Sequence, residues 1–557
     1  MDKNTLIALL LIGAVLLLWP MYMKTVVGPQ ESTLQEEPMD RETAAEPEAK
    51  PPEKDSPVQR TSRMPYSATE QRSTRSNETM KADTLFITTN RIRAALSSLG
   101  GGTLVGWELL DYFQQPENQG DPSERVQMIP DEAQGNLGIA FGVDFGDLVF
   151  DIETDTLGRE KSVRFTAFLP NGGRLEKAYT FYPDAYHCEL VVKIIGMNRN
   201  RLGDHYLITW NSGLASSESV RSRKNDLTYY EAFALQGGEI LKTKEKGTGF
   251  REGITDWAAI RTKYFIGAVI PREPSANGAE LEGTKIKQKI DDKNEDENQK
   301  VEWKQFHVKL AMPYSGAAEE THRFDIYLGP LDYHEVRAME AGLEKTMNFG
   351  WTIIRPFSIA FFYTLEFLER YLGNYGWAII VFSIIIKVLL YPLTRKSLQS
   401  MRQMQELQPK IKALQEKHKK DPQRLNQETM KLYKQHGVNP MGGCLPLLLQ
   451  MPVLFALFNL FRTTIMLRQA SFLGVIHDLS APDAIFGNIN VLPILMGATM
   501  IIQQKLSSQD PKQKVMAYMM PIFMLFIFYN LSAGLNLYYL MFNVLTISQE
   551  LIMKRKK

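Results

Sequence analysis

Five long apolar runs in the C-terminal third of the chain limit what the protein can fold into. They cover residues 374–393, 441–461, 489–506, 515–531 and 533–552. A helix rises about 1.5 Å per residue, so each run approaches the ~30 Å thickness of the hydrocarbon core of a bilayer. Each run is predicted to be a transmembrane helix, because a helix satisfies its own backbone hydrogen bonds in lipid.

A further apolar stretch, residues 6–23, carries no charge. Its last residues, from Trp19 and Pro20 to Lys24, lack the small-residue pattern of a signal-peptide cleavage site. We therefore expect a retained membrane anchor over residues 1–24. Residues 25–81 are rich in Pro, Glu, Ser, Thr and Arg and contain few large aliphatic side chains. Such a segment buries too little apolar surface to offset its ordering entropy, so we expect a disordered linker.

Residues 82–341 have a different pattern, in which short alternating or β-branched runs are separated by Gly, Pro and Asn. The clearest runs are residues 85–89, 103–109, 164–169, 189–195, 206–210, 264–270 and 306–312. Many short strands with this punctuation predict an all-β, sandwich-like domain. Within it, glycines 100–102 are predicted to form a turn and the charged residues 291–300 an exposed loop.

Composition excludes several classes of function. The 64 basic and 63 acidic residues are nearly balanced, which gives no overall preference for nucleic acid as a direct partner. The eight histidines form no spacing typical of metal ligands, so neither a metal nor another cofactor is expected. Cys188 and Cys444 fall in regions predicted to lie in different compartments, which argues against a disulfide between them.

The distribution of basic residues predicts the orientation in the membrane. Lys and Arg are dense in residues 394–440 and in the tail 553–557, whereas the loop after Thr464 contains only Arg468. Because basic loops remain in the cytoplasm, six spans place both termini inside and the β domain outside. Residues 345–371 have apolar side chains every three or four positions together with charged ones, the pattern of an amphipathic helix on the membrane surface.

The basic segment is itself predicted to fold, as a cytoplasmic helical hairpin over residues 395–437. One face of its first helix carries the apolar residues Met401, Met404, Leu407, Ile411 and Leu414.

Lys387 is the residue most indicative of function, because it lies inside the first of the five apolar runs. An ammonium at membrane depth costs about 2.5–3.5 kcal/mol on insertion scales, and therefore usually faces a polar or hydrated interior. Three positions spaced by four residues, Ser383, Lys387 and Tyr391, share one helix face. Gln450 adds a polar point, and a second polar stripe on the last run consists of Asn536, Tyr539, Asn543, Thr546 and Glu550.

These groups predict a hydrated cavity in the inner half of the bilayer, open to the cytoplasm. Lys387 precedes Thr394 by seven residues, which is roughly 10 Å along a helix. Two simpler interpretations stay open: Lys387 reaches the cytoplasmic headgroups with its long stem, and the polar stripe on the last run joins helices by hydrogen bonds.

Several motifs together resemble one family, the YidC membrane-protein insertases. They are the run Tyr391-Pro392-Leu393-Thr394, the hairpin, Asn439-Pro440-Met441-Gly442-Gly443-Cys444-Leu445-Pro446, Leu448-Leu449-Gln450-Met451-Pro452, Leu467-Arg468-Gln469-Ala470, His477-Asp478-Leu479-Ser480, Leu492-Pro493-Ile494-Leu495-Met496-Gly497 and Gly534-Leu535-Asn536-Leu537-Tyr538-Tyr539. They follow one another in order over nearly all of residues 350–552.

The resemblance implies a multi-pass helical protein of the Gram-negative inner membrane, with a five-helix insertase core and a periplasmic β-supersandwich domain. It implies Sec-independent insertion of nascent inner-membrane proteins, assistance to the Sec translocon, and contacts with lipids and the ribosome. By position, a client-binding groove would be formed by Lys387, Ser383, Gln450, Tyr539 and Thr546, with the hairpin helping to receive clients. The family usually has arginine where this chain has Lys387, which keeps the charge and loses the planar guanidinium.

Two other functions fit parts of the pattern. A small-solute transporter also places polar groups near the middle of the membrane, although the five core spans show no internal repeat. An intramembrane hydrolase would use Ser383 as nucleophile and Lys387 as base, although no oxyanion donor is evident in the sequence. Solute flux into proteoliposomes, compared with insertion of a single-span client, separates the transporter from the insertase.

Substitution of Ser383 by alanine tests the hydrolase directly. We expect Ser383→Ala to retain insertion of a reconstituted client, because an insertase needs no nucleophile there. Complete loss of activity in a folded variant would favour the hydrolase instead.

Overall fold

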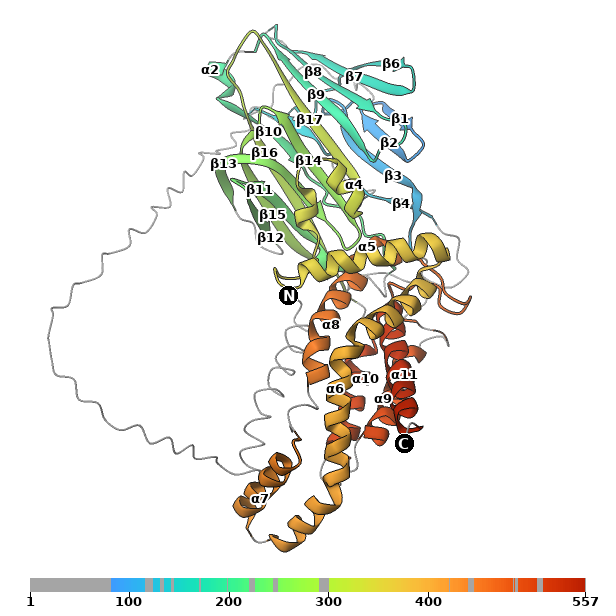
Figure 1. Ribbon diagram of the computed structural model, residues 1–557. Coiled ribbons are helices and arrows are strands. Elements are labelled where there is room, and N and C mark those ends of the chain that lie inside the picture. The colour runs from blue at the N-terminus through green and yellow to red at the C-terminus, as the bar shows by residue number, and fades with distance from the viewer. Residues whose placement is uncertain are drawn as a thin grey trace, which may run out of the picture.

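The computed structural model describes residues 82–555 except 116–123, 131–134, 142–144, 170–171, 198, 220–225, 244–248, 290–299, 420, 439–444, 484, 486–488 and 508–513. The predicted anchor at 1–24 and linker at 25–81 lie outside the described residues, as do most of the charged loop after residue 290 and the last two residues of the tail. Two bodies are visible, a β-rich domain and a set of helices that extends away from it (Figure 1).

The β-rich domain contains the strands β1–β17, and every pairing between them is antiparallel. Their bounds are β1 Thr84–Thr88, β2 Ile92–Ser97, β3 Thr103–Phe113, β4 Arg125–Gln127, β5 Gly138–Ala140, β6 Asp151–Leu157, β7 Glu160–Phe168, β8 Arg174–Phe181, β9 His187–Ile195, β10 His205–Trp210, β11 Glu231–Gln236, β12 Glu239–Thr243, β13 Phe250–Arg261, β14 Phe265–Glu273, β15 Ala276–Lys289, β16 Lys300–Pro313 and β17 Glu319–Pro330. A short helix, α2 (Arg199–Leu202), lies between β9 and β10.

The strands form two sheets. The smaller has the order β1-β2-β3-β4, and the larger, of 13 strands, has the order β5-β10-β16-β15-β13-β14-β17-β9-β8-β7-β6, with β11 and β12 joined to β13. Burial alternates residue by residue along β8, β9 and β10, as expected for strands with one face on a core. The predicted β-rich domain is therefore confirmed, and each run identified in the sequence lies on one of these strands.

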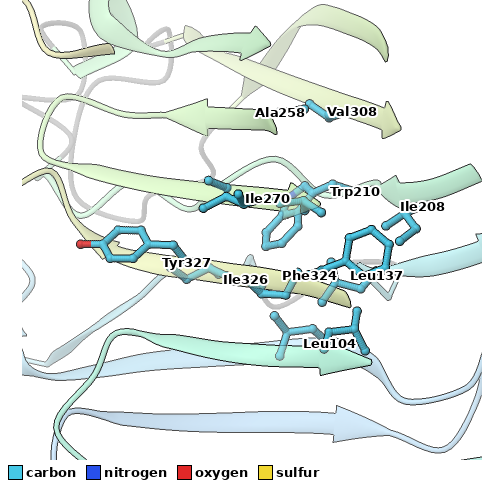
Figure 2. Close-up of a cluster of buried hydrophobic side chains, with 14 of the residues drawn as sticks. Leu104, Leu137, Ile208, Trp210, Ala258, Ile270, Val308, Phe324, Ile326 and Tyr327 are labelled. Atoms are coloured by element: carbon cyan, nitrogen blue, oxygen red, sulfur yellow. The ribbon is translucent and has the colours of Figure 1, made fainter. Parts of the chain in front are cut away.

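The two sheets share one apolar core. Trp107 of β3 is fully buried, and its indole nitrogen donates a 2.9 Å hydrogen bond to the carbonyl of Leu328 on β17. Figure 2 shows Leu104 of β3 together with Phe324 and Ile326 of β17 in this core. Burial of these side chains supplies the main force that holds the sheets together.

The glycine turn at 100–102 joins β2 to β3, as predicted. Gly102 has a φ of +68°, which favours glycine, and a Cβ there would lie 2.3 Å from the ring of Phe165. Its carbonyl accepts hydrogen bonds from the Tyr179 hydroxyl, at 2.6 Å, and from the buried amine of Lys177, at 3.3 Å. The turn thereby satisfies two polar groups inside the core.

The remaining described residues are mostly helical. The segments are α4 Tyr333–Ala338, η1 Leu343–Thr346, α5 Arg355–Leu372, α6 Tyr375–Lys417, α7 Pro422–Gln435, α8 Leu445–Thr463, η3 Ile465–Leu467, α9 Val491–Ser507, α10 Lys514–Phe528 and α11 Ala533–Arg555. Helix α5, which falls in the predicted amphipathic segment, lies between the β domain and the other helices (Figure 1). Gly373 ends α5 with φ +65°, and the side chain of Asn374 then caps the start of α6.

Helix α6 differs from the sequence-based division into a span at 374–393 and a hairpin arm from 395. It is a single helix of 43 residues, with Pro392 and Pro409 inside it. A proline removes one backbone hydrogen bond and can bend a helix without ending it, and no turn residue accompanies either proline. The first arm of the hairpin is therefore continuous with the apolar part of α6, and α7 packs back as the second arm.

The helices differ in the length of their apolar segments. Among the described residues, one 18-residue window, Tyr375–Pro392, has the length and mean hydropathy, 1.8, of a membrane span. Two shorter apolar helical segments are Val491–Leu506 and Met519–Phe528.

Two glycines with similar backbone angles test the packing of the turn. We expect Gly102→Ala to lower the stability of the full-length protein by about 2 kcal/mol or more, because positive φ and a collision with Phe165 add up. Gly158 has φ +65°, and a Cβ added there would have no atom within 4 Å, so Gly158→Ala should cost only about 1 kcal/mol. Thermal unfolding in detergent measures both variants, and equal losses would contradict the steric role of Phe165.

Candidate functional site

The candidate site lies between α6 and α11, with α8 and α9 beside them. Both α6 and α11 begin at the end of the helical region that faces the β domain (Figure 1). Lys387 is twelve residues into α6 and Thr546 is thirteen residues into α11, which puts both about 18–20 Å below that end. The two side chains therefore meet at the same depth.

The amine of Lys387 donates a 2.7 Å hydrogen bond to the hydroxyl oxygen of Thr546. That hydroxyl in turn donates to the carbonyl of Phe542, also at 2.7 Å. The ring of Phe542 lies 4.6 Å from the amine, within the range of a cation–π contact. Lys387 therefore points into the helix bundle, and the headgroup-directed interpretation of this lysine does not describe the structure.

The other members of its stripe have separate environments. Ser383 is fully buried, and its hydroxyl donates to the carbonyl of Ile379 one turn earlier. Tyr391 is 41% exposed. The nucleophile–base contact that a Ser-Lys hydrolase needs is thus replaced by two other bonds, Ser383 to Ile379 and Lys387 to Thr546.

The polar stripe on α11 makes hydrogen bonds to α9 and to the C-terminal end of α10. Asn543 donates to the hydroxyl of Thr499 on α9 at 3.3 Å, and Asn536 donates to the carbonyls of Phe528 and Leu531. These bonds fit the interpretation of the stripe as a junction between helices. Tyr539 packs edge-on against Phe528, and its buried hydroxyl has no hydrogen-bond partner among the residues that the structure describes. Gln450 of α8 is half-buried.

Three features of the site were not predicted. Phe542 and Thr499 are direct neighbours of predicted residues, yet their spacing alone does not mark them as polar-site residues. Glu550, noted in the stripe but not assigned to the groove, is buried and interacts electrostatically with Lys387. The α11 face therefore supplies a hydroxyl, an aromatic ring and a carboxylate around one amine.

The hairpin face predicted to receive clients is partly used by the hairpin itself. Leu407 and Ile411 are buried against Val438, and Met404 packs on the same cluster. Leu414 is half-buried and lines a cleft of about 340 Å³ between α6 and α7, together with Lys410, Lys417 and Lys431. The side chain of Met401 lies outside the described residues.

Comparison with known proteins identifies the family. A family model described as "60Kd inner membrane protein" matches residues 367–557, and one described as "YidC periplasmic domain" matches residues 84–360. A membrane protein insertase YidC from Chlorobium phaeovibrioides is 35% identical over 584 residues, covering 99% of this chain and 94% of the relative. The chain belongs to the YidC family.

A second relative agrees with that assignment to the YidC family. A relative of the same name from Chlorobaculum parvum is 34% identical over 586 residues, covering 99% of this chain and 94% of its own. Among solved structures, an active YidC insertase with its first transmembrane domain resolved matches 86% of this chain and 93% of its own, with 17% identity and a TM-score of 0.38. The two relatives confirm the resemblance found in the motifs and extend it over the β domain.

Removal of one hydroxyl tests the centre of the site. We expect Thr546→Val to reduce insertion of a client by about tenfold, because a hydrogen bond to a charged group contributes roughly 1.5 kcal/mol. Thr546→Ser keeps the hydroxyl and should remain near the activity of the parent protein. Equal activity of Val and Ser variants in proteoliposomes would show that the hydroxyl is not needed.

Proposed function

We propose that this protein inserts inner-membrane proteins and helps them fold, alone and together with the Sec translocon, through a polar groove that is open to the cytoplasm. The observation that carries the proposal is the Lys387 amine, held by Thr546 and Phe542 between α6 and α11 inside the helix bundle. A positive charge whose direct contacts are neutral groups can attract an acidic client segment at membrane depth. Family membership supports the reaction class.

The groove would be formed by Lys387 with Ser383, Tyr391, Gln450, Asn536, Tyr539, Asn543 and Thr546. The unpartnered hydroxyl of Tyr539 and the side-chain oxygen of Asn536 offer polar contacts, since each lacks a protein partner among the described residues. A client's short polar flank would exchange water for these groups while it crosses the inner half of the bilayer. Glu550 would limit how strongly the groove holds an acidic flank, which favours release.

The outer surface of the helices suits lipid and apolar client segments. On α6, Ile384, Ile385, Val388 and Leu389 are exposed, and on α10 so are Met519, Ile522 and Phe526. Burying a client's apolar segment beside this surface contributes about 0.8 kcal/mol per CH₂ group. The membrane potential would add to that for charged flanks, so no nucleotide cofactor is required.

The topology proposed for this function has six spans, with both termini cytoplasmic and the β domain periplasmic. Matches to an inner-membrane family and to a periplasmic-domain family support it. In that orientation α6 carries the hairpin into the cytoplasm, where its basic cleft would meet acidic surfaces of nascent chains or the ribosome.

A charge series at Lys387 tests the proposal. For insertion of a client with an acidic flank into proteoliposomes, we expect Lys387→Arg to retain activity, Lys387→Ala to lose most of it and Lys387→Glu to be the least active, because the attraction is electrostatic. Lys412→Ala, an exposed lysine on the same helix, is the matched control and should keep full activity in this purified system. Equal insertion by Arg, Ala and Glu variants would reject the electrostatic groove.

A further inference from the structure

The described residues of the loop at 464–490, namely 464–483, 485, 489 and 490, are here called the outer loop and contact the first residues of three helices. The side chain of Asn374, which caps α6, donates to the carbonyl of Ser471 at 2.8 Å. The carboxylate of Asp483 accepts from the amide of Leu492 at the start of α9. At α11, the amides of Ala533 and Gly534 donate to the carbonyls of Ala481 and Leu479.

Arg468 of the outer loop is bound almost entirely by the β domain. Its side chain is 2% exposed, and its Nε donates a 2.9 Å hydrogen bond to the carboxylate of Glu218. One terminal nitrogen donates to the carbonyl of Phe113 at 2.8 Å, and the other to the carbonyl of Ser217 at 3.0 Å. Because the guanidinium is planar and bonds three fixed acceptors, it fixes both the orientation of the outer loop and its distance from the β domain.

Neighbouring contacts strengthen the same junction. Gln469 donates to the carbonyls of Phe113 and Gln114, at 3.1 and 3.2 Å. Ile465 packs in the core of the β domain, whereas Tyr333 of α4 packs with the helices. The β domain and the helical region therefore pack against each other through apolar side chains. Arg468 adds a buried ion pair to the same junction.

A small cavity beside this junction leads toward α11. Its volume is about 50 Å³, and its lining includes Glu218 and Lys263 of the β domain, Ser480 of the outer loop and Leu535 of α11. Leu535 is adjacent to Asn536, the first polar residue of the α11 stripe. The cavity therefore lies beside the Glu218 end of the junction and the start of α11.

We propose that Arg468 is a positioning residue that keeps the polar groove closed to the exterior. By fixing the outer loop to the β domain, it holds the loop across α6, α9 and α11 and prevents the small cavity from joining the groove. This inference rests on the proposed groove, but its test measures access from outside and not insertion. Without Arg468, the Glu218 carboxylate is left buried without its cation, which favours separation of loop and domain.

The experiment uses the full chain with Cys188→Ala, Cys444→Ser and a reporter, Asn543→Cys, on α11. Spheroplasts expose only the outer face to a membrane-impermeant maleimide, and inverted vesicles expose only the cytoplasmic face. We expect Arg468→Ala to raise the outside labelling rate at least tenfold, and Arg468→Lys and Glu218→Gln to raise it by a smaller factor. Labelling from the cytoplasmic face should stay unchanged.

Arg323→Ala is the matched control, because Arg323 makes a 2.8 Å pair with Glu189 entirely within the β domain. It should leave outside labelling at the level of the parent protein. If Arg468→Ala accumulates and melts like the parent yet is labelled no faster from outside, the inference is overturned. If that variant does not accumulate, unchanged labelling of both Arg468→Lys and Glu218→Gln overturns it in the same way.

The result is independent of the charge series at Lys387. Faster outside labelling with normal responses to Lys387 substitutions supports both proposals. Faster labelling combined with equal activity of the Lys387 variants supports closure by Arg468 and rejects the electrostatic groove.

Discussion

A charged amine inside a membrane helix must be solvated by the protein or by water that the protein holds, because hydrocarbon offers it nothing. Here the amine of Lys387 meets the Thr546 hydroxyl and the Phe542 ring, with the Glu550 carboxylate nearby. This arrangement requires α6 and α11 to be adjacent and in register by depth. Helices α8 and α9 pack beside this pair.

The β domain takes part in this arrangement through a second set of buried charges. Arg468 and Glu218 are both almost inaccessible, and their pairing crosses from the outer loop to the domain. Other ionisable groups gather nearby: burial raises the pKa of Asp226 to about 6, assisted by Glu218, and burial lowers the pKa of Lys263. A junction of this kind is specific in geometry, since a buried charge tolerates only a partner in the right place.

Much of the architecture was predictable from local pattern. Each predicted strand run lies on an observed strand, because alternation of apolar and polar residues has the two-residue period of a half-buried sheet. The described parts of the four core runs at 441–461, 489–506, 515–531 and 533–552 lie largely on α8 to α11, because a long uninterrupted apolar run favours a helix. The division of α6 was less accurate, since a proline between two helical patterns does not by itself indicate whether the helix ends or bends.

The residues of the candidate site were chosen from sequence spacing, and that spacing indicated none of their pairings. Spacing by four put Ser383 and Lys387 on one face, yet the hydroxyl of Ser383 bonds its own helix and the amine of Lys387 bonds another. Similarly, Leu407 and Ile411 were recognised as an apolar face without any sign that Val438 covers it.

The sequence by itself determined the family, the β-rich and helical halves, and the presence of a lysine inside a long apolar run, because periodicity, composition and ordered motifs are local properties of a chain. The tertiary structure alone decided that Thr546 receives the amine of Lys387 and that Arg468 joins the outer loop to Glu218, 250 positions away. Such contacts depend on how elements distant in the sequence pack together, and on which residues of neighbouring helices lie at the same height. No local sequence pattern encodes either property.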